Sequence, residues 1–257
     1  MTASRVPSAT RTLRVLRYLA SRPAPSSLET IARACDLPRS TAYHLLNTMI
    51  AEGFVVHDPQ QHRFALGLST LEAGAGFVRH SPLLQVARAP MASAVDRLGV
   101  SCYLAIPQGR DVVLVLEDRA PLLPPLLMRP TLRIPARSTS PGHAWLAALP
   151  PHRIPYLYPG PEAFEDGHHQ GPRDLRTLEA TLAAVRAQGY ASERSALHSG
   201  LCTVAAAIEN PDPTSSSGPV GTVGVAFRPE RTETSGRLGG EVVRLSREIG
   251  AHLVGAA

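Results

Sequence analysis

The sequence predicts an α+β protein, with a small and mainly helical N-terminal part followed by a larger part of mixed helices and strands. Three amphipathic helical patterns follow one another closely between residues 10 and 53. After residue 100, β-hairpin patterns mix with helices and lack the regular strand–helix–strand alternation of a parallel sheet. The length of 257 residues leaves room for one large domain or two smaller ones.

The first predicted helix runs through TRTLRVLRYLASR and stops before Pro23. Its expected buried side is formed by Leu13, Leu16, Leu19 and Ala20. In the following SSLETIARACD, apolar residues recur at i, i+3, i+4 and i+7, which is one face of a second helix. Ser26 and Glu29 have the spacing of a capping box and are expected to start it.

The third predicted helix, RSTAYHLLNTMI, begins only two residues after the second one ends. Pro38 is expected at its first position, where the missing N–H costs nothing, and Gly53 is expected to end it. Its expected buried stripe is Ala42, Leu45, Leu46, Met49 and Ile50. Two short helices joined by so short a turn form a helix-turn-helix.

A predicted hairpin, FVVHDPQQHRFALG, completes a winged helix-turn-helix over residues 1–67. In such a unit the second helix of the pair lies in the major groove of DNA with its early residues at the base edges. Exposed residues that can contact bases or phosphates are predicted on the helix and on the wing: Arg39, Ser40, Thr41, Tyr43, His44, Asn47, Gln60, Gln61, His62 and Arg63. Winged helices that serve protein–protein contacts remain the alternative.

The charge distribution favours DNA as the partner. Residues 1–67 hold eight Arg against four acidic residues, whereas residues 68–257 hold eighteen Arg against seventeen acids. A positive excess confined to the predicted DNA-binding part is typical of a domain that meets a polyanion. A solvated, arginine-rich helix face is the alternative explanation of the same excess.

Several classes of protein are excluded or unsupported by the sequence. Apolar runs never approach the length of a membrane span, and the polar start MTASRVPSAT has no signal-peptide core, so a cytoplasmic protein is expected. Cys35, Cys102 and Cys202 are too widely spaced for a disulfide framework or a zinc site. Common catalytic signatures are absent and His168-His169 fits a solvated loop, so we expect no metal, no cofactor and no enzyme.

The remaining chain divides into a linker helix and a second domain. Leu68, Leu71, Ala75 and Val78 have helical spacing and predict a linker helix over residues 68–80. Over residues 81–257 we expect a helix ending at Gly99, a hairpin turning at Gly109-Arg110, and a short helix in GHAWLAALP. Then follow a helix over 172–188, strands over 202–209 and 220–227, and a final helix over 234–253. Helices packed on an antiparallel sheet are the predicted arrangement.

One stretch of the second part has the composition of a ligand site. In RIPARSTSPGHAW, hydroxyl residues lead into a helix start, where free backbone N–H groups favour anions such as carboxylates. The leucines of PLLPPLLM could cover an apolar ligand body. Ordinary N-capping by Thr139 or Ser140 explains the hydroxyl residues equally well.

Taken together, these stretches resemble the IclR family of bacterial transcription regulators. The resemblance lies in RTLRVLRYLA, SLETIARACDLPRSTAYHLLNTMIAEGFV, HRFALG, SPGHAWLAALP and GYASERSALHSGLCTVAAAI. It implies a GAF-like effector domain over 81–257 and a linker helix that takes part in dimer contacts. By position, it implies an effector pocket formed by Leu123, Leu126, Ser140, Pro141, Glu193, Leu201, Thr203, Gly224 and Ala226.

The expected function is a regulator that binds a two-fold symmetric operator in double-stranded DNA as a homodimer or a dimer of dimers. A small-molecule effector, such as an organic acid, is expected to change that binding. Glu193 would repel a bare anion unless it is protonated or paired, for example with Arg137, so the ligand is expected to carry a hydroxyl or amine as well. The alternatives are a ligand-binding protein whose winged helix contacts proteins and, third, a hydrolase.

The chain departs from the family pattern at several of these positions. The usual Gly-Lys-Ala is Gly142-His143-Ala144, and a frequent cysteine is Thr203. Hydroxyl residues common in the last strand are replaced by Gly224 and Ala226. These differences concern the identity of the ligand and leave the expected fold unchanged.

Overall fold

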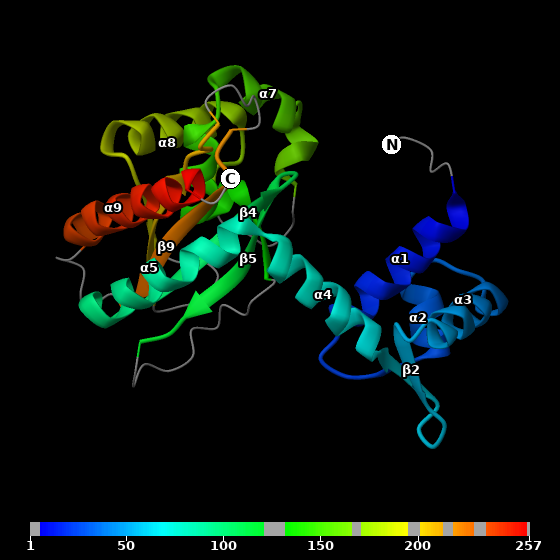
Figure 1. The fold of residues 1–257 in the computed structure, drawn as a ribbon. Helices are drawn as coiled ribbons and strands as arrows, with labels where there is room; N and C mark the ends of the chain where they lie inside the picture. The colour runs from blue at the N-terminus through cyan, green and yellow to red at the C-terminus, as the bar shows by residue number, and fades with distance from the viewer. Residues whose placement is uncertain are drawn as a thin grey trace. The chain divides into compact units, whose positions relative to one another are not determined.

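The computed structural model describes residues 6–120, 132–165, 171–194, 201–212, 218–228 and 235–255. The chain forms two compact units, residues 1–80 and residues 81–257, and each is described by itself (Figure 1). In the described part of the chain, no helix combines the length and the apolar character needed to cross a membrane. Leu123, Leu126, His168-His169 and most of the loop PDPTSSSG lie outside the described residues.

The first unit packs three helices against a small sheet. The helices are α1 (Pro7–Ala20), α2 (Leu28–Ala34) and α3 (Arg39–Ala51), and the strands are β1 (Ser26–Ser27), β2 (Val55–Asp58) and β3 (Arg63–Leu66). The antiparallel strand order is β1-β3-β2, so β3 is central. The buried core is Val15, Leu19, Ile31, Cys35, Leu46, Met49, Val55 and Phe64.

Three local predictions for this unit were wrong in detail. Leu13 is 55% exposed while Val15 is fully buried, because α1 turns its Val15–Leu19 side, not its Leu13–Ala20 side, toward the core. Ser27, not Ser26, caps α2 by accepting a bond from the Thr30 N–H. Ser26 instead pairs with Phe64 in the sheet. Pro38 immediately precedes α3 rather than occupying its first position.

Helix α4 (Leu68–His80) follows the wing at the end of the first unit. None of its residues is buried in the single chain, and Leu68, Leu71 and Phe77 are each more than half exposed. Among the described residues, α4 therefore presents large apolar side chains to solvent.

The second unit is built on a six-stranded antiparallel sheet in the order β6-β5-β4-β9-β8-β7. Its strands are β4 (Ser101–Gln108), β5 (Asp111–Asp118), β6 (Arg133–Pro135), β7 (Ala191–Arg194), β8 (Cys202–Ile208) and β9 (Gly221–Phe227). Its helices are α5 (Pro82–Leu98), α6 (Ser140–Ala148), α7 (Ile154–Leu157), α8 (Leu175–Gln188) and α9 (Ser235–Val254). The predicted α+β class with an antiparallel sheet flanked by helices is confirmed.

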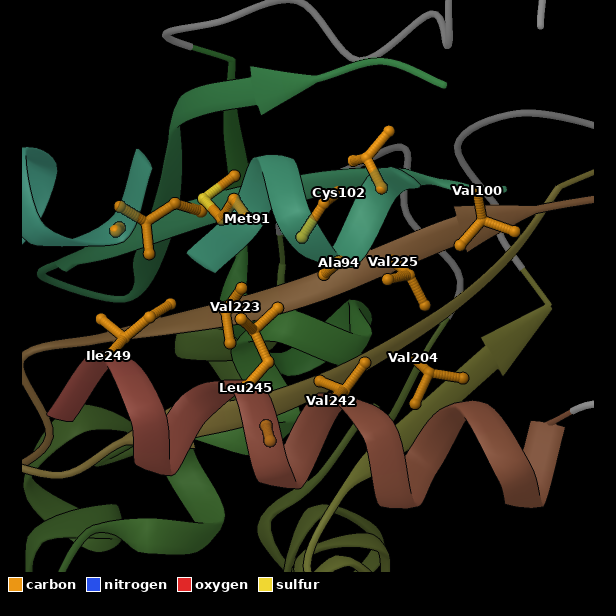
Figure 2. Packing of buried hydrophobic residues seen from close by; sticks show 14 of the residues in the cluster. Met91, Ala94, Val100, Cys102, Val204, Val223, Val225, Val242, Leu245 and Ile249 are labelled. Atoms are coloured by element: carbon orange, nitrogen blue, oxygen red, sulfur yellow. The ribbon is translucent and has the colours of Figure 1, made fainter. Parts of the chain in front are cut away.

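Helices cover both faces of this sheet. On one face α5 and α9 pack against alternate strand residues, among them Cys102, Val204 and Val225 (Figures 1 and 2). The opposite face carries Tyr103, Ala205 and Ala226 and is covered by α6, α7 and α8. Because side chains alternate along a strand, β8 and β9 contribute to both cores and read as continuous apolar runs.

Helix α8 starts three residues later than the sequence pattern indicates. The Asp174 carboxylate accepts a 2.7 Å bond from the Thr177 N–H and caps the helix, so residues 172–174 stay outside it. Gly189 ends α8 with a φ of 82°, as predicted from its place after the last apolar residue. Gly99 ends α5 in the same way, with a φ of 63°.

Candidate functional site

Helix α3 buries one side and presents a polar side to solvent. Ala42, Leu46 and Met49 are buried, whereas Ser40, Tyr43, His44 and Asn47 are exposed and Thr41 is half-buried. Tyr43 is 50% exposed, so it does not serve the core. The predicted helix residues therefore form one accessible surface of hydroxyl, imidazole, phenol and amide groups, which can donate to and accept from base edges.

Arg39 begins α3 and forms an ion pair with Glu29 of α2, with 2.9 Å between Nη2 and Oε1. Both side chains are mostly exposed, and exposed pairs of this kind contribute little to stability. A hydrogen bond with its own backbone N–H is the main cause that lowers the pKa of Glu29; burial opposes it, and the nearby Arg39 charge lowers the pKa further. The Arg39 side chain is thus oriented by a weak ion pair, which it can exchange for an ion pair with a phosphate.

The wing residues lie on a turn that hydrogen bonds to the Asp58 side chain hold in place. The Asp58 carboxylate accepts bonds from the N–H groups of Gln60 and Gln61, and His62 adopts a left-handed φ of 52°. This geometry leaves Gln60, Gln61 and His62 exposed at the tip. Arg63 donates a 3.0 Å bond to the Pro25 carbonyl oxygen, which ties the wing to the segment before α2.

The start of α6 is shaped by a close approach of two backbone segments. A Cβ on Gly142 would lie 2.0 Å from the carbonyl oxygen of Ala136, so no other residue fits there without a shift of the backbone. This approach folds residues 136–142 tightly and buries the whole STSPG segment, including Ser140 and Pro141. Ser140 is thereby fixed at the first turn of α6.

Three predicted effector residues meet at this helix start. The backbone N–H of Ser140 donates a 2.7 Å bond to Oε2 of Glu193 on β7. The Ser140 hydroxyl donates a 2.7 Å bond to the Thr203 hydroxyl on β8. Ser140 is fully buried, Thr203 is 4% exposed and Glu193 is half-buried. Residues up to 63 positions apart in sequence thus form one polar cluster.

Tyr103 belongs to the same cluster and was missed in the sequence. Its hydroxyl lies 3.3 Å from the Ser140 hydroxyl, and burial is the main cause that raises its pKa. A Cβ on Gly224 would lie 2.4 Å from the Tyr103 hydroxyl, so the glycine of β9 makes room for the phenol of β4. The available signal was a tyrosine in an aliphatic strand together with a glycine inside another strand.

The other predicted effector residues surround this cluster. Ala226 lies opposite Thr203 in the β8–β9 pairing and is fully buried, and half-buried Leu201 packs against the same core. Arg137 is 3% exposed and donates a 2.7 Å bond to the Pro172 carbonyl oxygen. Nε2 of His143 lies 2.6 Å from the Arg137 carbonyl oxygen, and burial lowers the pKa of His143. Across the described residues, no three acidic, Cys or His side chains gather as a metal site would require.

Comparison with known families matches nearly the whole chain. The family model "IclR helix-turn-helix domain" matches residues 8–59, and the model "Bacterial transcriptional regulator IclR C-terminal" matches residues 75–251. The chain belongs to the IclR family. It is a DNA-binding transcription regulator with an effector-binding C-terminal domain and not an enzyme, as the sequence predicted.

Similar proteins agree with this IclR assignment. The HTH-type transcriptional repressor AllR of Klebsiella pneumoniae is 26% identical over 238 residues, which cover 91% of this chain and 86% of AllR. An IclR transcriptional regulator from Alicyclobacillus acidocaldarius has the same fold, with a TM-score of 0.81, 21% identity, and coverage of 97% of this chain and 100% of that one. An IclR homolog from Microbacterium hydrocarbonoxydans, solved with 4-hydroxybenzoate, has a TM-score of 0.79 at 19% identity and covers 96% of this chain and 99% of its own.

Proposed function

We propose that this IclR-family regulator recognises its operator through the exposed side of α3 and through the wing. The support is the exposed row Ser40, Tyr43, His44 and Asn47 on a helix whose other side is buried in the core. His44 and Asn47 offer donors and acceptors for base edges, while Arg39 and Arg63 offer charge to the phosphates. Thr41, Gln61 and His62 complete the proposed contact surface. The proposed site of action is the bacterial cytoplasm, where the chromosome lies.

The operator is proposed to be two-fold symmetric, with the protein bound as a homodimer or a dimer of dimers. One helix-turn-helix buries too little surface for high specificity, and paired modules bind paired half-sites about one helical turn apart. Helix α4 supports pairing because the structure leaves its large apolar side chains Leu68, Leu71 and Phe77 exposed. Covering such a face with a second copy removes it from water.

A small-molecule effector is proposed to bind near the start of α6, at Ser140, Pro141, Glu193 and Thr203, with Leu201, Gly224 and Ala226 around them. The support is a buried polar cluster at the edge of the core, where Glu193 is half-buried. Leu123 and Leu126 remain proposed contacts from the sequence alone. The effector must bind one DNA-binding state better than the other, because a ligand with equal affinity for both shifts nothing.

The test of the DNA-binding surface begins with genome-wide mapping of bound DNA, which supplies the operator. Operator affinity of the full chain is then measured over a range of salt concentrations. Removing the imidazole by His44→Ala should cost roughly 1 to 3 kcal/mol on the operator and little on unrelated DNA. Removing the charge by Arg39→Ala should weaken binding to every sequence and reduce the salt slope by about one.

Two outcomes would refute this assignment. If both variants kept wild-type affinity and salt slope, DNA recognition would not run through α3. If the full chain bound no DNA but captured a protein through the same surface, the winged helix would serve protein contacts. The second result would favour the alternative function, a ligand-binding protein whose winged helix contacts other proteins.

A further inference from the structure

The edge of β8 borders a hollow beside the C-terminal half of α6, away from the proposed effector site at the start of that helix. Two adjoining cavities of about 340 and 280 Å³ make up this edge hollow, and both are lined by Ala207, Glu209, Ser246 and Arg247. Residues of α6 and of the end of α8 line the larger cavity as well. The hollow therefore has the size of a small-ligand site.

β8 has an open edge at this hollow because its neighbour β7 is too short to cover it. The last pair between the two strands joins Ala191 to Ala205, whereas β8 runs on to Ile208. Gly189, with its φ of 82°, turns the chain from α8 into β7 and is itself a lining residue of the hollow. On this side of β8, no strand of the described chain lies beside Ala207.

The open edge at Ala207 consists of its backbone N–H and C=O groups. The Val220 N–H donates to the Ile208 carbonyl oxygen, so the polar groups of Ile208 point toward β9. Because these groups alternate in direction along a strand, those of Ala207 point away from β9 and into the hollow. Within the described part of the chain, neither group has a hydrogen-bond partner.

A free α-amino acid matches this pair of groups. In an antiparallel sheet, two opposed residues of a hydrogen-bonded pair exchange both N–H···O bonds. The ammonium and carboxylate of an α-amino acid are attached to one carbon, as the N–H and C=O of a residue are. A single amino acid can therefore exchange both bonds with Ala207, and a molecule with more carbons between its two groups cannot do so with the same geometry.

The charges around the hollow match the charges of such a ligand. Glu209 and Arg247 line both cavities, and among the described residues neither forms an ion pair. A ligand ammonium beside Glu209 and a ligand carboxylate beside Arg247 would form charge-assisted hydrogen bonds. We propose that the edge hollow binds a free α-amino acid, with its main-chain groups paired to Ala207 and its charges to Glu209 and Arg247.

Arg186 adds a second positive charge on the α8 side of the hollow. Its Nε donates a 2.8 Å bond to the Ala147 carbonyl oxygen, which leaves its two Nη groups for a ligand carboxylate. An acid without an amine would be repelled by Glu209, and an amine without an acid would be repelled by the two guanidinium groups. Analogues that carry only one of the two charges should therefore bind more weakly.

The test compares amino acids with such analogues by calorimetry and thermal stabilisation of the full chain at neutral pH. The sets are alanine with ethylamine and propionate, leucine with isopentylamine and isocaproate, and phenylalanine with phenethylamine and hydrocinnamate. In at least one set the amino acid should bind about tenfold more tightly than both analogues. The β-amino acid with the same side chain, whose charges are farther apart, should lose a similar factor.

The same measurements can overturn the proposal in two ways. Binding of no amino acid, or equally tight binding of an amine or acid analogue in every set, would show that the charge pair is not recognised. Tighter binding of the N-acetyl amide of the amino acid, which stands for a residue inside a peptide, would assign the open edge to a partner strand instead.

Variants test whether the amino acid lies in the edge hollow. Arg247→Gln should weaken its binding about tenfold, and Glu209→Gln should weaken it while strengthening the acid analogue, because the repelling charge is gone. Both side chains are exposed, so these variants should fold as the wild type does. Arg237→Gln on α9 and Glu179→Gln on α8 make the same changes of net charge outside the hollow and should leave the affinity unchanged.

Unchanged affinity of both hollow variants would place amino-acid binding elsewhere and refute the proposal. The inference does not rest on the proposed effector site, since Ser140 and Thr203 do not line the hollow. Operator binding of the two hollow variants without ligand should equal that of the wild type, because neither residue belongs to the winged helix.

Discussion

Charged side chains at both candidate sites are held by the protein before any partner arrives. Arg39 pairs with Glu29, Arg63 donates to the Pro25 carbonyl, and Glu193 accepts the Ser140 N–H. Fixing a long side chain in advance lowers the entropy that binding must remove. If the proposed phosphate and ligand contacts form at these residues, the internal contacts compete with them, so a substitution at each position is expected to change affinity.

At Arg39 the competing group is the Glu29 carboxylate, so we expect its removal to increase the affinity for DNA. Glu29→Gln should tighten binding to all DNA sequences about two- to fivefold at low salt, because Arg39 no longer shares its charge. The measurement is affinity for the operator and for unrelated DNA at two salt concentrations. Glu179→Gln on α8, an equal change of net charge elsewhere in the chain, is the control and should have a smaller effect. A gain confined to the operator would contradict this account of Glu29.

His143 predicts a pH dependence of stability. Burial lowers the pKa of His143 below its ordinary value of 6.5, so the unfolded chain takes up a proton more readily than the native one. The stability it contributes is complete above pH 6.5 and falls as the pH drops from there toward the lower folded pKa. Nε2 must carry the proton of the neutral ring, because its partner is the Arg137 carbonyl oxygen.

The variant His143→Gln keeps a donor and cannot be charged. Between pH 6.5 and the folded pKa, wild type should lose up to about 1.4 kcal/mol of unfolding free energy per pH unit relative to this variant. Denaturant unfolding at pH 7.5, 6.5 and 5.5 measures the difference. Parallel pH profiles of the two proteins would show that His143 does not carry this dependence.

At the scale of elements, α6 is held at both ends by one connected segment. Glu193 of β7 accepts the first-turn N–H of Ser140, and Arg186 of α8 donates a 2.8 Å bond to the Ala147 carbonyl near the other end. An anion at the start and a cation at the end both complement the helix dipole. Since α8 and β7 are joined directly through Gly189, a ligand that moves Glu193 acts on a segment that also holds the far end of α6.

The adjacent glycines of α9 predict opposite effects of the same substitution. A Cβ on Gly240 would meet nothing within 4 Å, so Gly240→Ala should raise the unfolding free energy by about 0.5 to 1 kcal/mol. A Cβ on Gly239 would lie 2.4 Å from the Tyr190 ring, so Gly239→Ala should lower it by about 1 to 3 kcal/mol. Denaturant unfolding of the two variants measures both. Equal gains would mean that Tyr190 moves aside at no cost.

For the whole molecule, we predict that α4 forms the contact between copies. Its side chains at Leu68, Leu71, Ala75 and Val78 share one side of the helix by their spacing, while Phe77 points to the opposite side. Leu71 is 69% exposed and Val78 is 37% exposed in the single chain. If this side is the contact between copies, its loss separates the paired winged helices that a two-fold operator requires.

The double variant Leu71→Ser with Val78→Ser should therefore shift the protein toward monomer and weaken operator binding by at least tenfold, about 1.4 kcal/mol. Sedimentation equilibrium and operator titration measure the two effects. Phe77→Ser removes a similar apolar side chain from the other side of α4 and should leave association intact. Unchanged association of the double variant would place the contact between copies elsewhere.

The sequence by itself determined the longer helices, the hairpins and their order, because helix periodicity, helix-ending glycines and hairpin alternation are local properties. The short elements β1, β6, β7 and α7 were not predicted from it. α3 with its exposed polar row, α5 ending at Gly99 and α8 ending at Gly189 follow from neighbours in the chain. The candidate site residues Ser140, Glu193 and Thr203 came from a family resemblance, and spacing alone would not have joined them.

The tertiary structure decided which side of each helix is buried and which residues join the sheet. Val15 rather than Leu13 is buried because the partners of α1 determine which side faces inward, and Ser26 joins a strand because Phe64 lies beside it. Tyr103 reaches Ser140 only through the pairing of β4 with β9, which brings Gly224 under its ring. Contacts of this kind join residues far apart in the chain, and their strength depends on burial and on the direction of donors, which exist only once the sheet has formed.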